Sequence, residues 1–368
     1  MKLVPQTAPY IRKNVSVKRM MLDVIIALAP VTLFAMIQNG WGAIYVLLIS
    51  LATMVATELI AHAVMHWPED MKIKELFTKE GFLKLKEKYT INNITASVIS
   101  GLIYALILPA YCNWYVVFVG ALFGMLFGKM LFGGLGSNIF NPAAVGRIFV
   151  GICFGTQISE AYEASKYFNV LTDGTINVSG TPLVNWNYSL ADIFFGQIPG
   201  CMGEVSALMI LIGAVYLFAR RSADLRSALG YFLSFSVIML VVTLSEVGLV
   251  SYTLTKWLSK ILAGGALFGA VYMITDPVTS PTTKYGRVLY GILAGCITAL
   301  IRAVGSYPEG VAFSILIVNM ITPTIDYFMR GKPNTYTWKQ IVLAASIILV
   351  VGFIVAAAIG GWLVWKII

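Results

Sequence analysis

Charged residues are scarce in this sequence. They make up 12% of its 368 residues, against roughly 25% in ordinary soluble proteins. Hydrophobic residues make up 58%, and the mean hydropathy is +0.82. So few charges cannot cover a water-facing surface, which excludes a soluble enzyme, a disordered chain and a nucleic-acid-binding domain. The composition predicts a polytopic membrane protein.

Cysteine and histidine are also rare. The four cysteines stand far apart and have neither metal-ligand nor redox spacing, so no disulfide framework is implied. The two histidines, His62 and His66, share one helical face, but no third histidine and no cysteine lies near them. We therefore expect an interfacial role for this pair and no metal site.

Long apolar windows recur along the chain, most of them near the roughly 20 residues that cross a membrane. Eleven can be drawn, and ten is equally defensible because one window could be re-entrant: 20–38, 41–62, 94–110, 113–131, 142–156, 205–219, 228–245, 258–275, 288–305, 311–329 and 339–365. The shortest, 142–156 and 205–219, are the weakest. We predict an all-α integral membrane bundle of about ten transmembrane helices.

Lysine and arginine gather in five connecting segments, although the net charge of the whole chain is +9. Alternating the spans puts all five on one side, which the positive-inside rule identifies as cytoplasmic. Lys256 and Lys260 fall on the other side and are the exception. We therefore expect a cytoplasmic N-terminus, membrane halves at 1–156 and 205–368, and an external segment at 157–204.

The external segment is unusually long for a connection between spans. It holds one lysine and five acidic residues, and its aromatic residues include Trp186, Tyr188, Phe194 and Phe195. Loops longer than about 12–15 residues are usually functional or disordered. The aromatic content favours a functional loop.

Glycine, proline and polar residues interrupt the apolar pattern at 132–147, 178–183 and 275–287. Irregular backbone at membrane depth is tolerated only where protein or a polar cavity satisfies it, so we expect broken helices there. Two of these segments, Asn141–Arg147 and Asp276–Arg287, look alike and suggest an internal repeat. The alternative is that both are ordinary turns between helices.

Ionisable residues inside spans are costly in lipid and are functional candidates by default. Glu58, Arg147 and Arg302 occupy such positions. Glu58 is the best carboxylate for a proton or sodium step, and with Arg302 it would mark an ion path; a structural ion pair is the alternative for Glu58. Near expected span ends, where snorkelling or helix capping is the simpler account, lie Asp23, Glu204, Asp276, Glu309 and Asp326.

Four motifs, in order along the chain, closely resemble those of the D component of the Rnf complex, the bacterial membrane ferredoxin:NAD oxidoreductase. They are more distantly similar to those of the B component of the sodium-pumping NADH:quinone reductase. The motifs are Phe132–Arg147, Phe195–Glu204, Thr275–Gly286, and Tyr307–Phe313 between Arg302 and Asn319. The resemblance covers nearly the whole chain.

In the resembled family, a threonine of an external loop carries FMN through a phosphoester bond that a flavin transferase installs. The match implies that Thr181 is the acceptor, within Ser179, Gly180, Thr181 and Pro182. Gly180 replaces the alanine that the family usually has before this threonine. Glycine and proline keep this stretch out of helix, and Trp186 and Tyr188 could enclose the flavin ring. On composition alone, a plain turn beside an aromatic belt is the alternative.

The resemblance implies a flavin-bearing subunit of the bacterial cytoplasmic membrane that passes electrons between ferredoxin and NAD with export of Na⁺ or H⁺. The chain lacks a cysteine cluster for iron–sulfur ligation and a dinucleotide fingerprint, so the Rnf components A, B, C, E and G would be needed. A second flavin, riboflavin, is expected among Asn141, Arg147, Asp276, Thr279 and Thr282. The alternative is a redox-inactive channel or secondary transporter.

Overall fold

The computed structural model describes residues 16–67, 89–164, 189–198, 200–247, 253–263, 265–304, 310–329 and 338–359. Throughout these residues the regular secondary structure is helical, which confirms the predicted all-helical class. In the part of the chain that the structure describes, six helices are long and apolar enough to cross a membrane, and several shorter apolar helices accompany them. The chain is therefore a multi-pass membrane protein.

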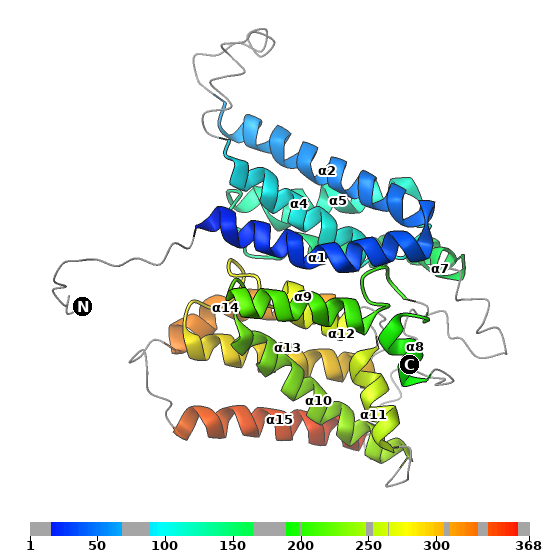
Figure 1. The fold of residues 1–368 in the computed structure, drawn as a ribbon. Helices are drawn as coiled ribbons and strands as arrows, with labels where there is room; N and C mark the ends of the chain where they lie inside the picture. The colour runs from blue at the N-terminus through cyan, green and yellow to red at the C-terminus, as the bar shows by residue number, and fades with distance from the viewer. Residues whose placement is uncertain are drawn as a thin grey trace, which may run out of the picture.

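The first group of helices precedes residue 164 and runs from blue through cyan to the green of α7 in Figure 1. Its members are α1 (Val17–Asn39), α2 (Trp41–Met65), α4 (Ile91–Leu106), α5 (Trp114–Gly128), η2 (Met130–Phe132), α6 (Pro142–Cys153) and α7 (Gly155–Glu163). Helix α2 packs against α4 and α5, and α5 packs against α6. Gly40, with φ of +56°, makes the tight turn between α1 and α2 that a side chain would strain.

The second group follows residue 189 and runs from green to red in Figure 1. Its members are α8 (Leu190–Phe195), α9 (Ala207–Arg220), α10 (Leu225–Val247), α11 (Thr253–Leu262), α12 (Gly265–Phe268), η4 (Gly269–Met273), α13 (Lys284–Val304), α14 (Gly310–Phe328) and α15 (Trp338–Ile359). Helix α13 packs against α10 and α14, and α15 lies against α10 and α13 at the far side from the first group (Figure 1).

Several of the apolar windows are not single helices. The window 258–275 divides into the end of α11, the four residues of α12 and the π-helical η4, so its prediction as one uniform span was wrong. Helix α4 ends at Leu106, and the Gly203 and Met202 amides donate to the Leu106 and Leu108 carbonyls at 2.7 and 3.1 Å. A loop from the second group thus satisfies backbone that the end of α4 leaves open.

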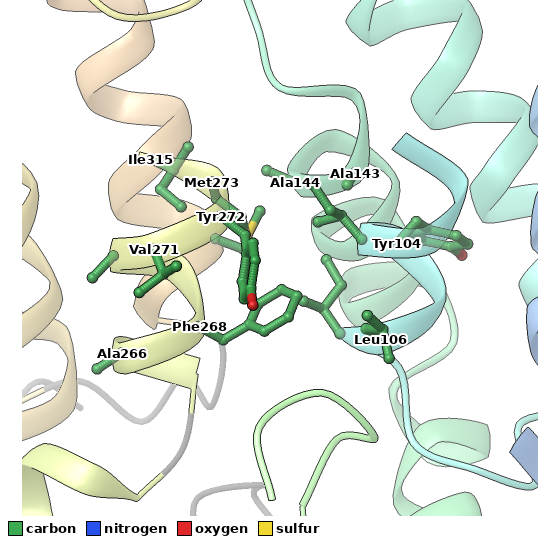
Figure 2. Close-up of a cluster of buried hydrophobic side chains, with 14 of the residues drawn as sticks. Tyr104, Leu106, Ala143, Ala144, Ala266, Phe268, Val271, Tyr272, Met273 and Ile315 are labelled. Carbon is green, nitrogen blue, oxygen red and sulfur yellow. The ribbon is translucent and has the colours of Figure 1, made fainter. Parts of the chain in front are cut away.

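The two groups meet along α1 and α9 and along α6 and α14. Figure 2 shows part of the core between them, where Phe268 and Tyr272 face Leu106 and lie near Ala144. The Tyr272 hydroxyl donates to the Ala27 carbonyl at 2.9 Å. Apolar packing and this buried hydrogen bond join the groups at their centre.

Asp23 of α1 also fastens the groups together, in place of the snorkelling or helix-capping role expected near a span end. It is 3% exposed, and it accepts hydrogen bonds from Tyr216, Arg220 and Ser222 at the end of α9 and beyond it. A carboxylate so deep requires such donors. Asp23 therefore holds α1 against α9.

The two segments that look alike in sequence have different local structures. Asn141 caps α6 directly: its side-chain oxygen accepts from the Ala143 and Ala144 amides, and Pro142 occupies the first helical position. Asp276 instead opens a turn, and α13 begins only at Lys284. An internal repeat stays a prediction, and these two segments do not take the same place in a helix.

Candidate functional site

A cavity of about 510 Å³ lies between the two groups of helices at the end where α1 begins. Cavities of this size accommodate cofactors and other small molecules. The start of α1, one face of α4 and Leu217 of α9 form apolar walls, and the loops after η2, α9 and η4 close one end. The polar side chains that line it are Asn92, Ser100, Lys129, Asn138, Asn141, Ser222, Tyr272, Thr275 and Asp276.

The first helical turn of α6 borders this cavity. Both Asn141 and Pro142 line it. Asn319 of α14 holds the Asn141 backbone: with its amide oriented to satisfy both atoms, its oxygen accepts from the Asn141 N–H at 3.2 Å and its nitrogen donates to the Tyr290 hydroxyl at 2.7 Å. A buried polar network thus connects the cavity rim with the second group of helices.

Asp276 lies opposite, in the turn after η4. Its carboxylate accepts from the Val278 amide and from the Thr279 hydroxyl, both at 3.1 Å. Thr279 is 2% exposed and therefore positions Asp276 rather than facing the cavity. Thr282 is not among the residues that line the cavity, and its backbone amide donates to Asp326 of α14 at 3.0 Å.

Of the five residues expected at a second flavin, the structure brings Asn141 and Asp276 to one cavity with Thr279 behind Asp276. Arg147 is one and a half turns along α6, where its guanidinium lies 3.2 Å from the Tyr162 hydroxyl and 3.8 Å from the Cys201 sulfur. Neither Arg147 nor Thr282 is among the residues that line the cavity.

Glu58 of α2 forms a buried ion pair with Lys129. Its Oε1 lies 2.7 Å from the Lys129 Nζ, and the two side chains are 1% and 3% exposed. The structural ion pair, the alternative to an ion-path role for Glu58, is therefore observed. Lys129 caps the end of α5 and also lines the cavity, so the ion pair and the cavity share one residue.

Arg302 does not lie beside Glu58. Its Nη1 donates to the Ala263 carbonyl at 3.4 Å, and its guanidinium stands over the Phe235 ring at 5.2 Å. It belongs to the contact between α13, α10 and the end of α11. The structure therefore places the two residues of the expected ion path in different parts of the bundle.

The histidine pair ends α2 as a stack. The His62 and His66 rings lie 4.2 Å apart, and Tyr89 meets His62 edge-on at 5.1 Å. Within the described residues, no group of three histidine, cysteine or acidic side chains is placed to hold a metal ion.

The expected attachment site lies outside the described residues. It comprises Thr181 with its neighbours Ser179, Gly180 and Pro182. The aromatic residues expected to enclose the flavin, Trp186 and Tyr188, also lie outside the described residues. The described neighbours are α7 before the gap and α8 after it. Helix α8 begins with a capping box in which Ser189 and Asp192 satisfy each other's backbone amides.

Sequence reasoning missed Lys129 and Asn138 as cavity residues. Both lie in or directly before the glycine-rich segment 132–147. A signal was present in Lys129, a lone lysine at the end of an apolar span, because such a residue needs a carboxylate partner. Asn138 has no comparable signal, because asparagine is common in turns.

Comparison with known proteins relates this chain to one family of membrane proteins. Residues 4–335 match the family described as NQR2, RnfD, RnfE. The chain is 32% identical to the D component of the Na⁺-translocating ferredoxin:NAD⁺ oxidoreductase complex of Acetobacterium woodii, over 90% of this chain and 95% of that protein. It is 29% identical to the D component of the ion-translocating oxidoreductase complex of Stutzerimonas stutzeri, over 86% and 92%.

A further relative is the B component of the Na⁺-translocating NADH-quinone reductase of Chromohalobacter salexigens. It is 39% identical over 62% of this chain, and the match spans 57% of that relative's length. The family match covers most of the chain, including every residue that lines the cavity. The chain therefore belongs to the NQR2, RnfD, RnfE family.

Proposed function

We propose that this chain is the flavin-bearing membrane subunit of an Rnf-type complex of the bacterial cytoplasmic membrane. The complex would transfer electrons between ferredoxin and NAD and couple this to translocation of Na⁺ or H⁺. Family membership over residues 4–335, and the extent of the match to the two Rnf-type relatives, support the proposal. The components A, B, C, E and G would supply the ferredoxin and NAD sites, and a flavin transferase would mature the chain.

The cavity between the two groups of helices is the observation that supports a redox function. Its apolar walls suit a planar ring system, and its polar rim offers amide and carboxylate groups to ring nitrogens and oxygens. Among the described residues that line it, the single cation is Lys129, which is engaged by Glu58. That favours a flavin without a phosphate, such as riboflavin, over a nucleotide.

Several of the residues that line the cavity would have definite roles in this proposal. The Asn141 side chain caps α6 at the cavity, while Asn138 and Asp276, which also line it, would bind polar edges of a ring. Met20, Met21 and Ile103, which line the cavity, would exclude water from the ring faces. A flavin held there would accept and release electrons, and the protein would set its position and potential.

Thr181 would carry FMN by a phosphoester bond, with Ser179, Gly180 and Pro182 as its immediate surroundings and Trp186 and Tyr188 against the ring. The two halves, 1–156 and 205–368, would form about ten spans with a cytoplasmic N-terminus, and 157–204 would lie outside. Glu58 would serve the ion path near the cavity, and Arg302 would contribute to it from a different part of the bundle.

The gel fluorescence of the denatured protein tests this function. Protein made together with a flavin transferase should fluoresce on a denaturing gel, and Thr181→Val should abolish the band. Ser179→Ala is the matched control and should keep it. The supernatant of the denatured complex should contain riboflavin as a separate, non-covalent flavin.

A redox-inactive channel or secondary transporter is the alternative. A non-fluorescent wild type that also releases no flavin would favour it. The contacts between the helix groups argue against a transporter that rocks its halves, because Asp23 ties α1 to α9 and Tyr272 ties η4 to α1. A rocking motion would break both buried connections.

A further inference from the structure

Lys129 has two neighbours of different kinds. Its ammonium bonds to Glu58 at 2.7 Å, deep between α2 and α5, and its side chain also forms part of the cavity wall. A ligand that fills the cavity would touch Lys129, since lining residues lie within about 4 Å of a bound molecule. Any charge on that ligand and the charge on Glu58 would therefore act on the same ammonium group.

The ion pair leaves part of Glu58 available. Among the described residues, the Oε2 atom of Glu58 is buried and has no hydrogen-bond partner, and the same holds for the Tyr89 hydroxyl and the Ser97 hydroxyl. Oxygen atoms of this kind bind hard cations or protons. Glu58 thus has one oxygen held by Lys129 and one that could take a cation.

The energetics indicate that such a pair is kept for more than stability. A buried ion pair gains little over apolar side chains of similar volume, because desolvation offsets the attraction between the charges. In a medium of low dielectric constant, however, a charge that arrives within a few ångströms changes the balance strongly. The arrangement suits a response to charge better than it suits a structural tie.

We propose that Lys129 is a charge switch between the cavity and Glu58. This inference rests on the proposed function, which puts a redox-active ligand in the cavity. When one electron arrives from a partner subunit's carrier, the cavity gains one negative charge that competes for the ammonium. Glu58, whose charge the ammonium then offsets less, takes up one Na⁺ or one H⁺ on its carboxylate. When the electron leaves to the next acceptor, the ammonium returns to Glu58 and the cation is released.

Na⁺ and H⁺ would both act through the Glu58 carboxylate, and other charged or titratable groups lie near it. Lys129 bonds to Glu58, Tyr89 lies near enough to interact with its charge, His62 lies one turn along α2 against Tyr89, and Asp276 lines the cavity near Lys129. The pH arm of the experiment therefore compares variants with wild type, because a flavin and His62 can contribute to a pH dependence of their own.

Thermodynamic reciprocity provides the test. If reduction in the cavity raises the cation affinity of Glu58, then the cation must raise the reduction potential in the cavity. The purified whole complex is titrated at fixed pH from about 1 to about 100 mM Na⁺, with choline keeping the ionic strength constant, and the potential of the non-covalent flavin is followed by its absorbance. Where a cation is bound in one redox state, each tenfold change in its concentration shifts the potential by up to about 59 mV for one electron.

In wild type the potential should rise with Na⁺, or, if protons are the cation, should rise more steeply with falling pH than in Glu58→Gln. Glu58→Gln and Lys129→Met should both lose this dependence while retaining the flavin, and Lys129→Arg should keep it. Asp224→Asn, a carboxylate outside this pair, is the control and should match wild type. If Lys129→Met does not fold, Glu58→Gln with Lys129→Gln removes both charges together.

Equal cation dependence in wild type and Lys129→Met would overturn the switch, because a structural lysine would change stability without changing this slope. A second outcome would overturn the switch but not the proposed function: the wild-type complex contains the flavin, its potential does not change with Na⁺, and its pH slope equals that of Glu58→Gln. Absence of any non-covalent flavin from the intact complex would overturn both the switch and the second-flavin part of the proposed function.

Discussion

At the scale of single residues, polar side chains fasten the loops at the cavity end of the bundle. Asp224, between α9 and α10, accepts from the Arg226 amide at 2.9 Å and from the Arg287 guanidinium. Burial alone would raise the pKa of Asp224, but these hydrogen bonds and the two arginine charges outweigh burial and hold the pKa below its usual value. The carboxylate thus ties the α9–α10 loop to α13.

The pH dependence of stability tests this tie. Because the pKa of Asp224 is lowered by folding, its contribution is present above the pKa of the unfolded state, about 4, and is lost as the pH falls through the folded value. At pH 7, Asp224→Asn should be less stable by about 1 kcal/mol, since the pair is partly exposed. Thermal unfolding in detergent at pH 7 and pH 3 should show this gap narrowing on acidification. A gap of constant size would contradict the assignment.

At the scale of helices, the contact between α5 and α6 positions the cavity rim. Gly124 of α5 faces the first turn of α6, where an added Cβ would lie 2.5 Å from the Pro142 carbonyl oxygen and 3.0 Å from the Gly146 Cα. These are backbone atoms, which cannot rotate away as a side chain would. The absence of a side chain at Gly124 therefore allows α6 to begin close to α5.

Gly124→Ala should push α6 away from α5 and destabilise the protein by about 1–3 kcal/mol, the usual range for overpacking. Gly352→Ala in α15 is the matched control, because an added Cβ there meets nothing within 4 Å. That change should be neutral or stabilising by up to about 1 kcal/mol, since alanine favours helix. Thermal unfolding of the two variants, monitored by size-exclusion chromatography, distinguishes these outcomes. Equal unfolding temperatures would contradict the close-packing role.

At the scale of the whole molecule, orientation follows from the distribution of cations. The end of the bundle with the cavity also holds Arg226, Lys284 and Arg287, whereas α7 begins at the opposite end, after α6. The positive-inside rule predicts that the cavity end is cytoplasmic. In the proposed function, electrons would then pass between the cavity side and the 157–204 segment.

Labelling of substituted cysteines tests this orientation in a background with Cys153→Ser, because Cys153 is exposed while the other three cysteines are buried. Thr156→Cys at the start of α7 should react with a membrane-impermeant maleimide in intact spheroplasts. Lys284→Cys at the start of α13 should react only after the membrane is permeabilised. The reverse pattern would invert the topology and would put the cavity outside.

Much of the fold could be predicted from local pattern. Apolar length located α1, α2, α10, α13, α14 and α15 within a few residues, because each must bury or expose a long apolar surface. The division of 258–275 into α11, α12 and η4 could not be predicted in this way. Its backbone departs from one helix because of tertiary contacts, such as Phe268 and Tyr272 against α4 (Figure 2), and hydropathy does not record these contacts.

The sequence by itself determined the membrane class, the distribution of cations and the motifs of the family, because composition and hydropathy depend on residue identity alone. It also singled out Asn141, Asp276 and Glu58. Only the tertiary structure decided that Asn141 and Asp276 share one cavity, that Arg147 lies apart from it, and that Lys129 connects this cavity to Glu58. These relations join residues up to 135 positions apart (from 141 to 276), and the packing of whole helices, which no local pattern encodes, brings them together.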